Sequence, residues 1–190
     1  MNSAISRRLE NALLSLFDKD YEASLLHCFP AIDKTASKRR PNVAVGKRFK
    51  AFLSDQRNII APIGLGVKMG KGCTFGGMSF EEAIYDLARN HLVHEGEFAD
   101  SFEIKSAHGS RLGGSWELSS ANILALIVAT LVAEENKGEA FSKTYELEIF
   151  GQKVDLNTLW GKEELVTEII DSAFEKPNKS MHPTADASAD

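Results

Sequence analysis

The chain has little cysteine and no long hydrophobic segment. Its 190 residues include two cysteines, Cys28 and Cys73, which do not form a Cys-x-x-Cys pair. They outline neither a disulfide framework nor a structural zinc site. The longest apolar run, residues 121–133, is too short to cross a bilayer, and residues 1–10 lack the apolar centre of a secretory signal. We therefore expect a cytoplasmic protein that does not enter a membrane.

Nucleotide-binding fingerprints are also missing, although residues 63–77 contain six glycines. Gly70-Lys71 lacks both a glycine five positions upstream and a following Ser or Thr. Gly64-Leu65-Gly66 lacks the third glycine of a dinucleotide motif. We therefore expect an irregular loop over these residues.

The composition is that of one globular domain with a polar tail. Hydrophobic residues make up 43% of the chain and charged residues 26%, which excludes a disordered body. We expect residues 1–175 to form a single helical domain. Residues 176–190 have almost nothing to bury, so a disordered tail is expected there.

Charge is distributed unevenly around a net value of −5. Residues 1–78 carry a net charge of +7, whereas residues 79–190 carry −12. A basic surface on the first part of the chain could contact phosphates, and a solvated helix end with its loop explains the same residues equally well. Next to the single acid Asp33, the densest basic stretch contains Lys34, Lys38, Arg39, Arg40, Lys47, Arg48 and Lys50.

Apolar residues at spacings of three and four predict most of the chain to be helical. Three helices are expected in the first third: residues 3–17, a helix after Asp20 that Pro30 kinks or begins, and residues 43–56. Residues 121–133 are apolar nearly all round and predict a buried central helix. A last helix is expected over residues 156–174.

Two short hairpins complete the expected fold. The segments 102–105 and 116–118 alternate in polarity and flank several glycines, and residues 145–149 alternate before a tight turn into 154–156. The expected fold class is therefore mainly α, a helical bundle with a small antiparallel β element.

The chemistry-bearing residues follow one further helix. Ser79 and Glu82 form a capping-box pattern, and Gly96 suits a helix C-cap, so this helix should run from about Phe80 to Glu95. Its end reads Arg89-Asn90-His91-Leu92-Val93-His94. Asn90 and His94 share a helix face, whereas Arg89 lies about 140° from His94 around the axis. Fraying or tightening near the helix end would bring Arg89 and His94 to one phosphate.

These side chains suit the cleavage of RNA without a metal. That reaction needs a base for the 2′-hydroxyl, an acid for the leaving oxygen and positive charge near the transition state. His94 suits either proton transfer, Arg89 can clamp phosphate oxygens, and Asn90 would orient the imidazole or a phosphate oxygen. Since one histidine cannot easily perform both transfers at once, a two-fold dimer that joins two copies of the helix would complete the site. Arg39, Arg40, Lys47 and Arg48 would hold the RNA backbone, and Tyr85 could stack on a base.

The segment Arg89-Asn90-His91-Leu92-Val93-His94 resembles the signature of the HEPN superfamily, an Arg, a polar residue, three further residues and His late in an amphipathic helix. The resemblance implies a helical bundle that dimerises through the motif helices. It also implies a metal-independent endoribonuclease without a cofactor, in which Arg89 and His94 are catalytic. Members of that family act in toxin–antitoxin, phage-defence or RNA-processing systems, so a cognate antitoxin is a possible partner.

The tail, residues 179–186, resembles sequence read through the recombination sites of bacterial integron gene cassettes. A mobile gene with a functionless tail is what this resemblance implies. It is compatible with a defence or toxin role.

Other readings of the motif remain open. In a purely structural reading, Arg89 could pair with Asp86, His91 could lie in the core, and His94 could cap the helix end. A separate alternative is a catalytically inactive module that uses this helix to dimerise or to bind a partner. A metal site is a further alternative, because His91, His94 and Glu95 lie at positions i, i+3 and i+4. The adjacent arginine would repel a cation, so we expect no metal.

Overall fold

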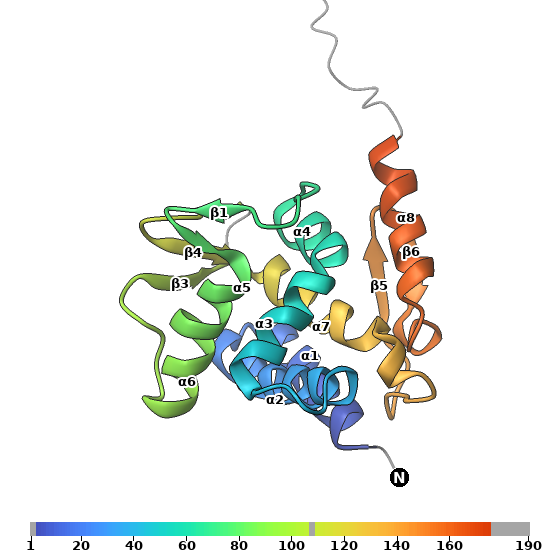
Figure 1. Cartoon of the computed structure of the whole chain (residues 1–190). Coiled ribbons are helices and arrows are strands. Elements are labelled where there is room, and N and C mark those ends of the chain that lie inside the picture. The colour runs from blue at the N-terminus through green and yellow to red at the C-terminus, as the bar shows by residue number, and fades with distance from the viewer. Residues whose placement is uncertain (1–2, 107–108, 176–190) are drawn as a thin grey trace, which may run out of the picture.

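The computed structural model describes residues 3–106 and 109–175 and shows a mainly α fold (Figure 1). The predicted tail, 176–190, lies outside the described residues. Four helices precede the first strands: α1 (Ala4–Phe17), α2 (Tyr21–Arg39), α3 (Val45–Asp55) and α4 (Arg57–Leu65). Ser3 caps α1 by accepting hydrogen bonds from the N–H groups of Ile5 and Ser6.

The central helix α7 (Ser120–Val132) organises the core. Helices α1, α2, α4 and α8 (Glu163–Glu175) all contact it. Its side chains from Ala125 to Val132 are all buried, as the all-round apolar pattern predicted. In Figure 1, α8 lies on one side of this core, whereas the helix that carries Arg89 lies on the opposite side.

Within the described residues, the strands form three separate pairs, and one of them corrects the sequence prediction. Strands β5 (Glu146–Ile149) and β6 (Gln152–Asp155) form the expected hairpin. Strands β3 (Phe102–Lys105) and β4 (Trp116–Ser119) pair in parallel, so the second predicted hairpin is wrong. Alternating polarity does not indicate strand direction, because side chains alternate in parallel and antiparallel pairs alike. The connection between these strands is longer than a tight turn, so the chain can return to the start of β3 before β4 begins.

The glycine-rich segment is more ordered than predicted. Helix α4 extends to Leu65 and ends at Gly66 in the left-handed conformation, with φ of +71°. Beyond it, β1 (Thr74–Phe75) and β2 (Met78–Ser79) form a small antiparallel hairpin. The turn between them contains Gly76 and Gly77, both with positive φ. The irregular loop expected over residues 63–77 is therefore wrong at both of its ends.

Two other helix predictions need correction. Pro30 does not begin α2 but lies well inside it. Because Leu26 and Pro30 are both exposed, water can solvate the carbonyl that proline leaves unpaired. The last helix begins later than predicted. A short 3₁₀ turn, η3 (Leu156–Thr158), precedes Gly161, whose φ of +69° separates it from α8. The 3₁₀ turn η2 (Glu134–Asn136) follows α7.

Within residues 3–106 and 109–175, no helix combines the length and apolar character needed to cross a membrane. The longest apolar run in the sequence is only 13 residues long.

Glu10 joins α1 to the segment that leads into the β5–β6 hairpin. Its carboxylate accepts hydrogen bonds from the backbone N–H and the hydroxyl of Ser142 and from the hydroxyl of Tyr145, the last at 3.0 Å. Burial raises the pKa of Glu10, but the hydrogen bonds from Ser142 and Tyr145 outweigh it and hold the pKa below its usual value of about 4.5. The ionised carboxylate therefore stabilises the folded chain.

This contact predicts a pH-dependent stability. Because the folded-state pKa of Glu10 is lowered, its contribution is complete above the unfolded-state pKa and is lost as pH falls through the folded-state value. Glu10→Gln should lower the free energy of unfolding at pH 7 by about 1–3 kcal/mol, and the difference should shrink towards pH 3. Urea denaturation of both proteins at the two pH values measures this. A difference that is constant with pH would contradict the role of the charge.

Candidate functional site

The helix predicted to carry the motif is present over residues Phe80–His94, here named the motif helix. Its start is the predicted capping box: the Glu82 N–H donates to Ser79 Oγ at 3.3 Å, and the Ser79 N–H donates to Glu82 Oε2 at 2.9 Å. Gly96 follows its end with φ of +85°. The predicted bounds are therefore confirmed to within about a residue.

The middle of the motif helix is a π-helix. An α-helical turn, α5 (Phe80–Ala83), leads into the π-helix η1 (Ile84–Arg89), and α6 (Asn90–His94) resumes the α-helix. The N–H of Asn90 donates to the carbonyl of Tyr85, five residues earlier. The helix thus widens just before Arg89, at the kind of irregularity that often marks functional sites.

Arg89 is held by three neighbours. Its Nη2 donates to Asp33 Oδ2 on α2 at 3.1 Å, and its Nη1 donates to Asn90 Oδ1 at 3.0 Å. The guanidinium carbon lies 5.4 Å from the centroid of the Tyr85 ring. The pair with Asp86 that the sequence allowed is not formed, because Asp86 lies 3.6 Å from Lys50 of α3 instead.

Tyr85 is positioned by close packing against α3. Its ring lies 5.3 Å from that of Phe49, and Lys50 Nζ lies 5.4 Å from its centroid. A Cβ atom at Gly46 would lie 2.9 Å from the Tyr85 hydroxyl, so a larger residue there would have to displace the end of this ring. Tyr85 therefore supports Arg89 and Lys50. A nucleobase that stacked on the ring would have to share it with these two cations.

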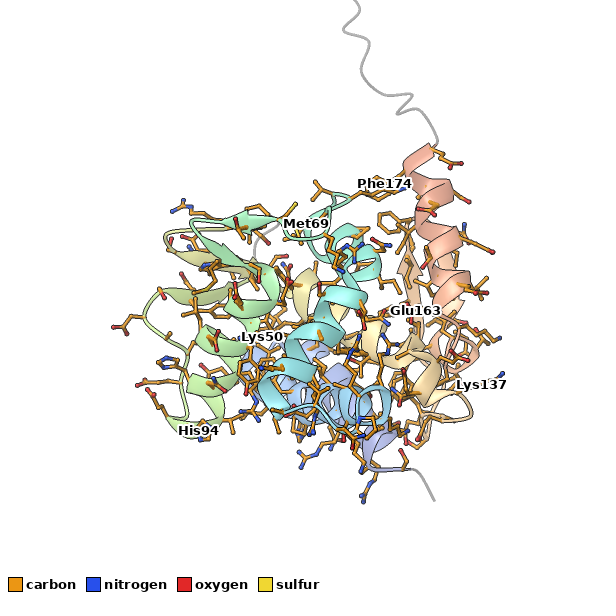
Figure 2. The ribbon with its side chains drawn as sticks, in the orientation of Figure 1. Lys50, Met69, His94, Lys137, Glu163 and Phe174 are labelled. Atoms are coloured by element: carbon orange, nitrogen blue, oxygen red, sulfur yellow. The ribbon has the colours of Figure 1, made fainter. Side chains whose placement is uncertain are left out.

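His94 lies at the other end of α6 and is exposed (Figure 2). Among the described residues, no hydrogen bond or ion pair joins its imidazole to Arg89 or Asn90. The neighbouring His91 is half-exposed, with Nδ1 3.2 Å from Glu95 Oε2, so it does not lie in the core. One chain therefore presents one uncommitted motif histidine, and Arg89 is directed towards α2 rather than towards it.

The basic residues predicted to hold RNA divide into two groups. Arg39 makes two hydrogen bonds to Glu135, through Nε at 2.7 Å and Nη2 at 2.9 Å, and Arg40 lies 2.7 Å from Asp55. Burial lowers the pKa of Arg39, but Glu135 outweighs it and raises that pKa above its usual value. These two arginines are therefore matched by carboxylates within the fold.

Lys47 and Arg48 lie on α3, the helix that packs against the motif helix. Lys47 is exposed, whereas Arg48 is half-buried and donates to the Val43 carbonyl at 3.4 Å. The structure thus brings Lys50 to the motif helix through Tyr85 and Asp86, and Lys47 lies one helical turn before Lys50 on α3. Sequence reasoning did not assign Lys50 to the site.

Asp33 is the other residue that sequence reasoning missed. It is the single acid beside the basic stretch 34–50, which was the available signal. Its pairing with Arg89 spans 56 positions of sequence, and helical spacing within one segment cannot predict such a contact.

No metal cluster is present in the part of the chain that the structure describes: no three His, Cys, Asp or Glu side chains gather to hold an ion there. Of the three candidate ligands, His91 and Glu95 contact each other. The geometry of residues 3–106 and 109–175 therefore gives the metal alternative no support.

An open pocket of about 780 Å³ lies at the start of α8, away from the motif helix. Its lining includes Lys137, Gly161 and Glu163, and no motif residue contributes to it. In Figure 2, Lys137 and Glu163 lie on the side of the molecule opposite His94. The motif helix and its contacts with α2 and α3 are therefore the candidate site.

Comparison with known proteins places the chain in a family. The model of the Rv1289 family matches residues 4–185. The chain belongs to the Rv1289 family. Two relatives, Rv1289 of Mycobacterium tuberculosis (strain ATCC 25618 / H37Rv) and Mb1320 of Mycobacterium bovis, are each 26% identical over 169 residues, 80% of this chain and 80% of the relative.

Both of these Rv1289-family relatives bear the name uncharacterized protein, so their names carry no activity to this chain. No solved structure matches the chain significantly.

Proposed function

We propose that this chain is a metal-independent endoribonuclease of HEPN type that cleaves RNA at a composite site formed by two motif helices in a dimer. The observation that carries the proposal is the arrangement of the motif helix. A positioned guanidinium, Arg89, precedes an exposed helix end that presents His94. We propose a HEPN-like helical bundle as the fold that accompanies this activity.

Each group has a chemical role. Arg89 would donate hydrogen bonds to phosphate oxygens and neutralise charge that develops in the transition state. His94 would take the proton of the 2′-hydroxyl or give a proton to the leaving 5′-oxygen. Asn90 would orient Arg89, because its side-chain oxygen already accepts a hydrogen bond from that residue.

The need for two chains follows from the proton transfers. Cleavage requires one base and one acid, and His91 is engaged by Glu95, which leaves His94. A two-fold axis beside α6 would bring two copies of His94 together. Val93, adjacent to His94, is 44% exposed and offers apolar surface to such a partner.

An endoribonuclease of this kind would act as a toxin or phage-defence effector that a cognate antitoxin inhibits.

Lys47 and Lys50 would contribute to RNA binding beside the motif helix. Arg39 and Arg40 would contribute less, because carboxylates already match their charges.

A catalytically silent dimerisation or partner-binding module is the second candidate function. The observation that favours it is the contact of Asp33 with Arg89, which neutralises the cation that the reaction needs. An RNA cleavage assay distinguishes the nuclease from the catalytically inactive module.

The activity is tested with matched oligonucleotides. Purified protein in EDTA should cleave a single-stranded RNA and leave the DNA of the same sequence intact, because the 2′-hydroxyl is the nucleophile. Product analysis should find a 2′,3′-cyclic phosphate on one fragment and a 5′-hydroxyl on the other. RNA that stays intact would refute the proposed nuclease activity, whereas cleavage that EDTA abolishes would indicate a metal-dependent enzyme.

A further inference from the structure

Asp33 is the anionic partner of the motif arginine. It lies on α2, and its Oδ2 accepts from Arg89 Nη2 at 3.1 Å. The side chains of Arg89 and Asp33 are only 16% and 20% exposed, so solvent screens this pair less than an ordinary surface pair. In the structure, the Asp33 carboxylate therefore accepts from Arg89 Nη2, the donor that a phosphate oxygen would otherwise use.

The contact between these two side chains is incomplete. Arginine and a carboxylate can form two parallel hydrogen bonds, but only Nη2 and Oδ2 are joined here. Within residues 3–106 and 109–175, Arg89 Nε and Asp33 Oδ1 are buried without a hydrogen-bond partner. An unmet donor and an unmet acceptor raise the free energy of the pair, which makes exchange for another anion easier.

Arg89 has two further supports that do not depend on Asp33. Asn90 Oδ1 accepts from its Nη1 at 3.0 Å, and the Tyr85 ring lies beneath its guanidinium carbon. Removal of the Asp33 charge would therefore leave Arg89 placed by its own helix. The carboxylate is not needed to hold the guanidinium at the site.

We propose that Asp33 sets the affinity of this site for phosphodiesters by competing with them for Arg89. A non-bridging oxygen of a phosphodiester can accept from Arg89 Nη2 in place of Asp33 Oδ2. RNA then binds by displacing Asp33 from the guanidinium. The inference rests on the proposed function in taking RNA as the ligand, and it adds a residue of α2 to the site.

A matched control lies one turn earlier on the motif helix. Asp86 carries the same charge as Asp33, but its partner is Lys50, 3.6 Å away, and both side chains are more exposed, at 42% and 32%. Replacement of either aspartate changes the net charge of the chain equally. Asp86→Asn also releases Lys50, which the proposed function places near the RNA, but solvent already screens this exposed pair, so its loss should change RNA affinity little. A larger gain in Asp33→Asn than in Asp86→Asn therefore reports on Arg89 and not on overall charge.

The test measures binding of a single-stranded 2′-O-methyl RNA hexanucleotide, which has phosphodiesters but no free 2′-hydroxyl to react. Isothermal titration calorimetry in EDTA compares the wild type with Asp33→Asn and Asp86→Asn. Asp33→Asn should bind about fivefold more tightly or better, whereas Asp86→Asn should stay within about twofold of the wild type. Arg89→Ala introduced with Asp33→Asn should remove the gain.

Three results would overturn the inference: equal gains in both aspartate variants, unchanged affinity in Asp33→Asn, or weaker binding in Asp33→Asn, which would make Asp33 a positioning residue for Arg89. Far-UV circular dichroism checks the fold, and Asp33→Ser serves as a second variant with the same expected direction. The probe cannot be cleaved, so binding and catalysis fail separately. If Asp33→Asn binds the RNA more tightly but the wild type does not cleave RNA, only the proposed function is refuted.

Discussion

Replacing His94 with alanine is expected to lower the rate of RNA cleavage by about 10²–10⁴-fold, the usual contribution of a positioned proton-transfer group. In the proposed site, His94 is the motif histidine free to exchange a proton with RNA, and its loss from both chains of the dimer removes the base and the acid together. The side chain is exposed, so the substitution should leave the fold unchanged. Initial rates on the single-stranded RNA in EDTA measure the effect.

His91→Ala is the matched control. It removes a histidine from the same turn of helix, but one that is engaged by Glu95 at 3.2 Å. Its cleavage rate should stay within about twofold of the wild type, since a surface hydrogen bond of this kind contributes little to structure. Equal rates for wild type, His91→Ala and His94→Ala would contradict the role of His94.

A large effect on stability is expected from Gly64→Ala, where α4 packs against α7. A Cβ atom at Gly64 would lie 2.7 Å from Asn122 Oδ1 and 3.1 Å from the backbone Cα of Asn122. Asn122 is 1% exposed, and its Nδ2 donates to Ser110 and Ser119, so it cannot move away freely. The free energy of unfolding should fall by about 1–3 kcal/mol, even though alanine favours helix more than glycine.

Gly70→Ala provides the comparison for this effect. A Cβ at Gly70 would lie 3.7 Å from Cys73 Sγ, an ordinary contact, and the residue is exposed. Its stability should stay within about 0.5 kcal/mol of the wild type. Urea denaturation followed by circular dichroism measures both variants, and equal midpoints would show that the helix crossing tolerates the added methyl group.

Local signals in the sequence were enough to predict the helix that carries the motif. Ser79 and Glu82 satisfy each other's backbone N–H groups, and Gly96 adopts the positive φ that ends many helices, so both ends were set by neighbouring residues. The buried helix α7 was predictable for a similar reason, because its apolar residues surround the helix.

Strand direction and helix continuity could not be predicted in this way. Residues 102–105 and 116–119 alternate in polarity whether their strands run parallel or antiparallel, and their parallel pairing depends on the path of the chain between them. Pro30 costs α2 one backbone hydrogen bond, but packing of Phe29 and Ala31 in the core holds the helix together across it.

The sequence motif indicated where the candidate site lies along the chain, but not which residues of other helices contact it. The motif named Arg89, Asn90 and His94, and the structure shows a hydrogen bond from Arg89 to Asn90 that the sequence did not predict. Asp33 and Lys50 reach the motif helix only because α2 and α3 pack beside it, and such pairings depend on tertiary structure. Tertiary structure also explains why Arg39, which looked free in a basic stretch, is bound by Glu135 of η2.

The most direct test of a shared Arg89–His94 cleft is the rate of RNA cleavage per chain, measured in EDTA over a range of protein concentrations. The proposed composite site predicts cleavage without a metal, at a rate per chain that rises with concentration until the dimer is fully formed. RNA that stays intact at every concentration, or a rate per chain that is constant down to concentrations where the protein is a monomer, would contradict it.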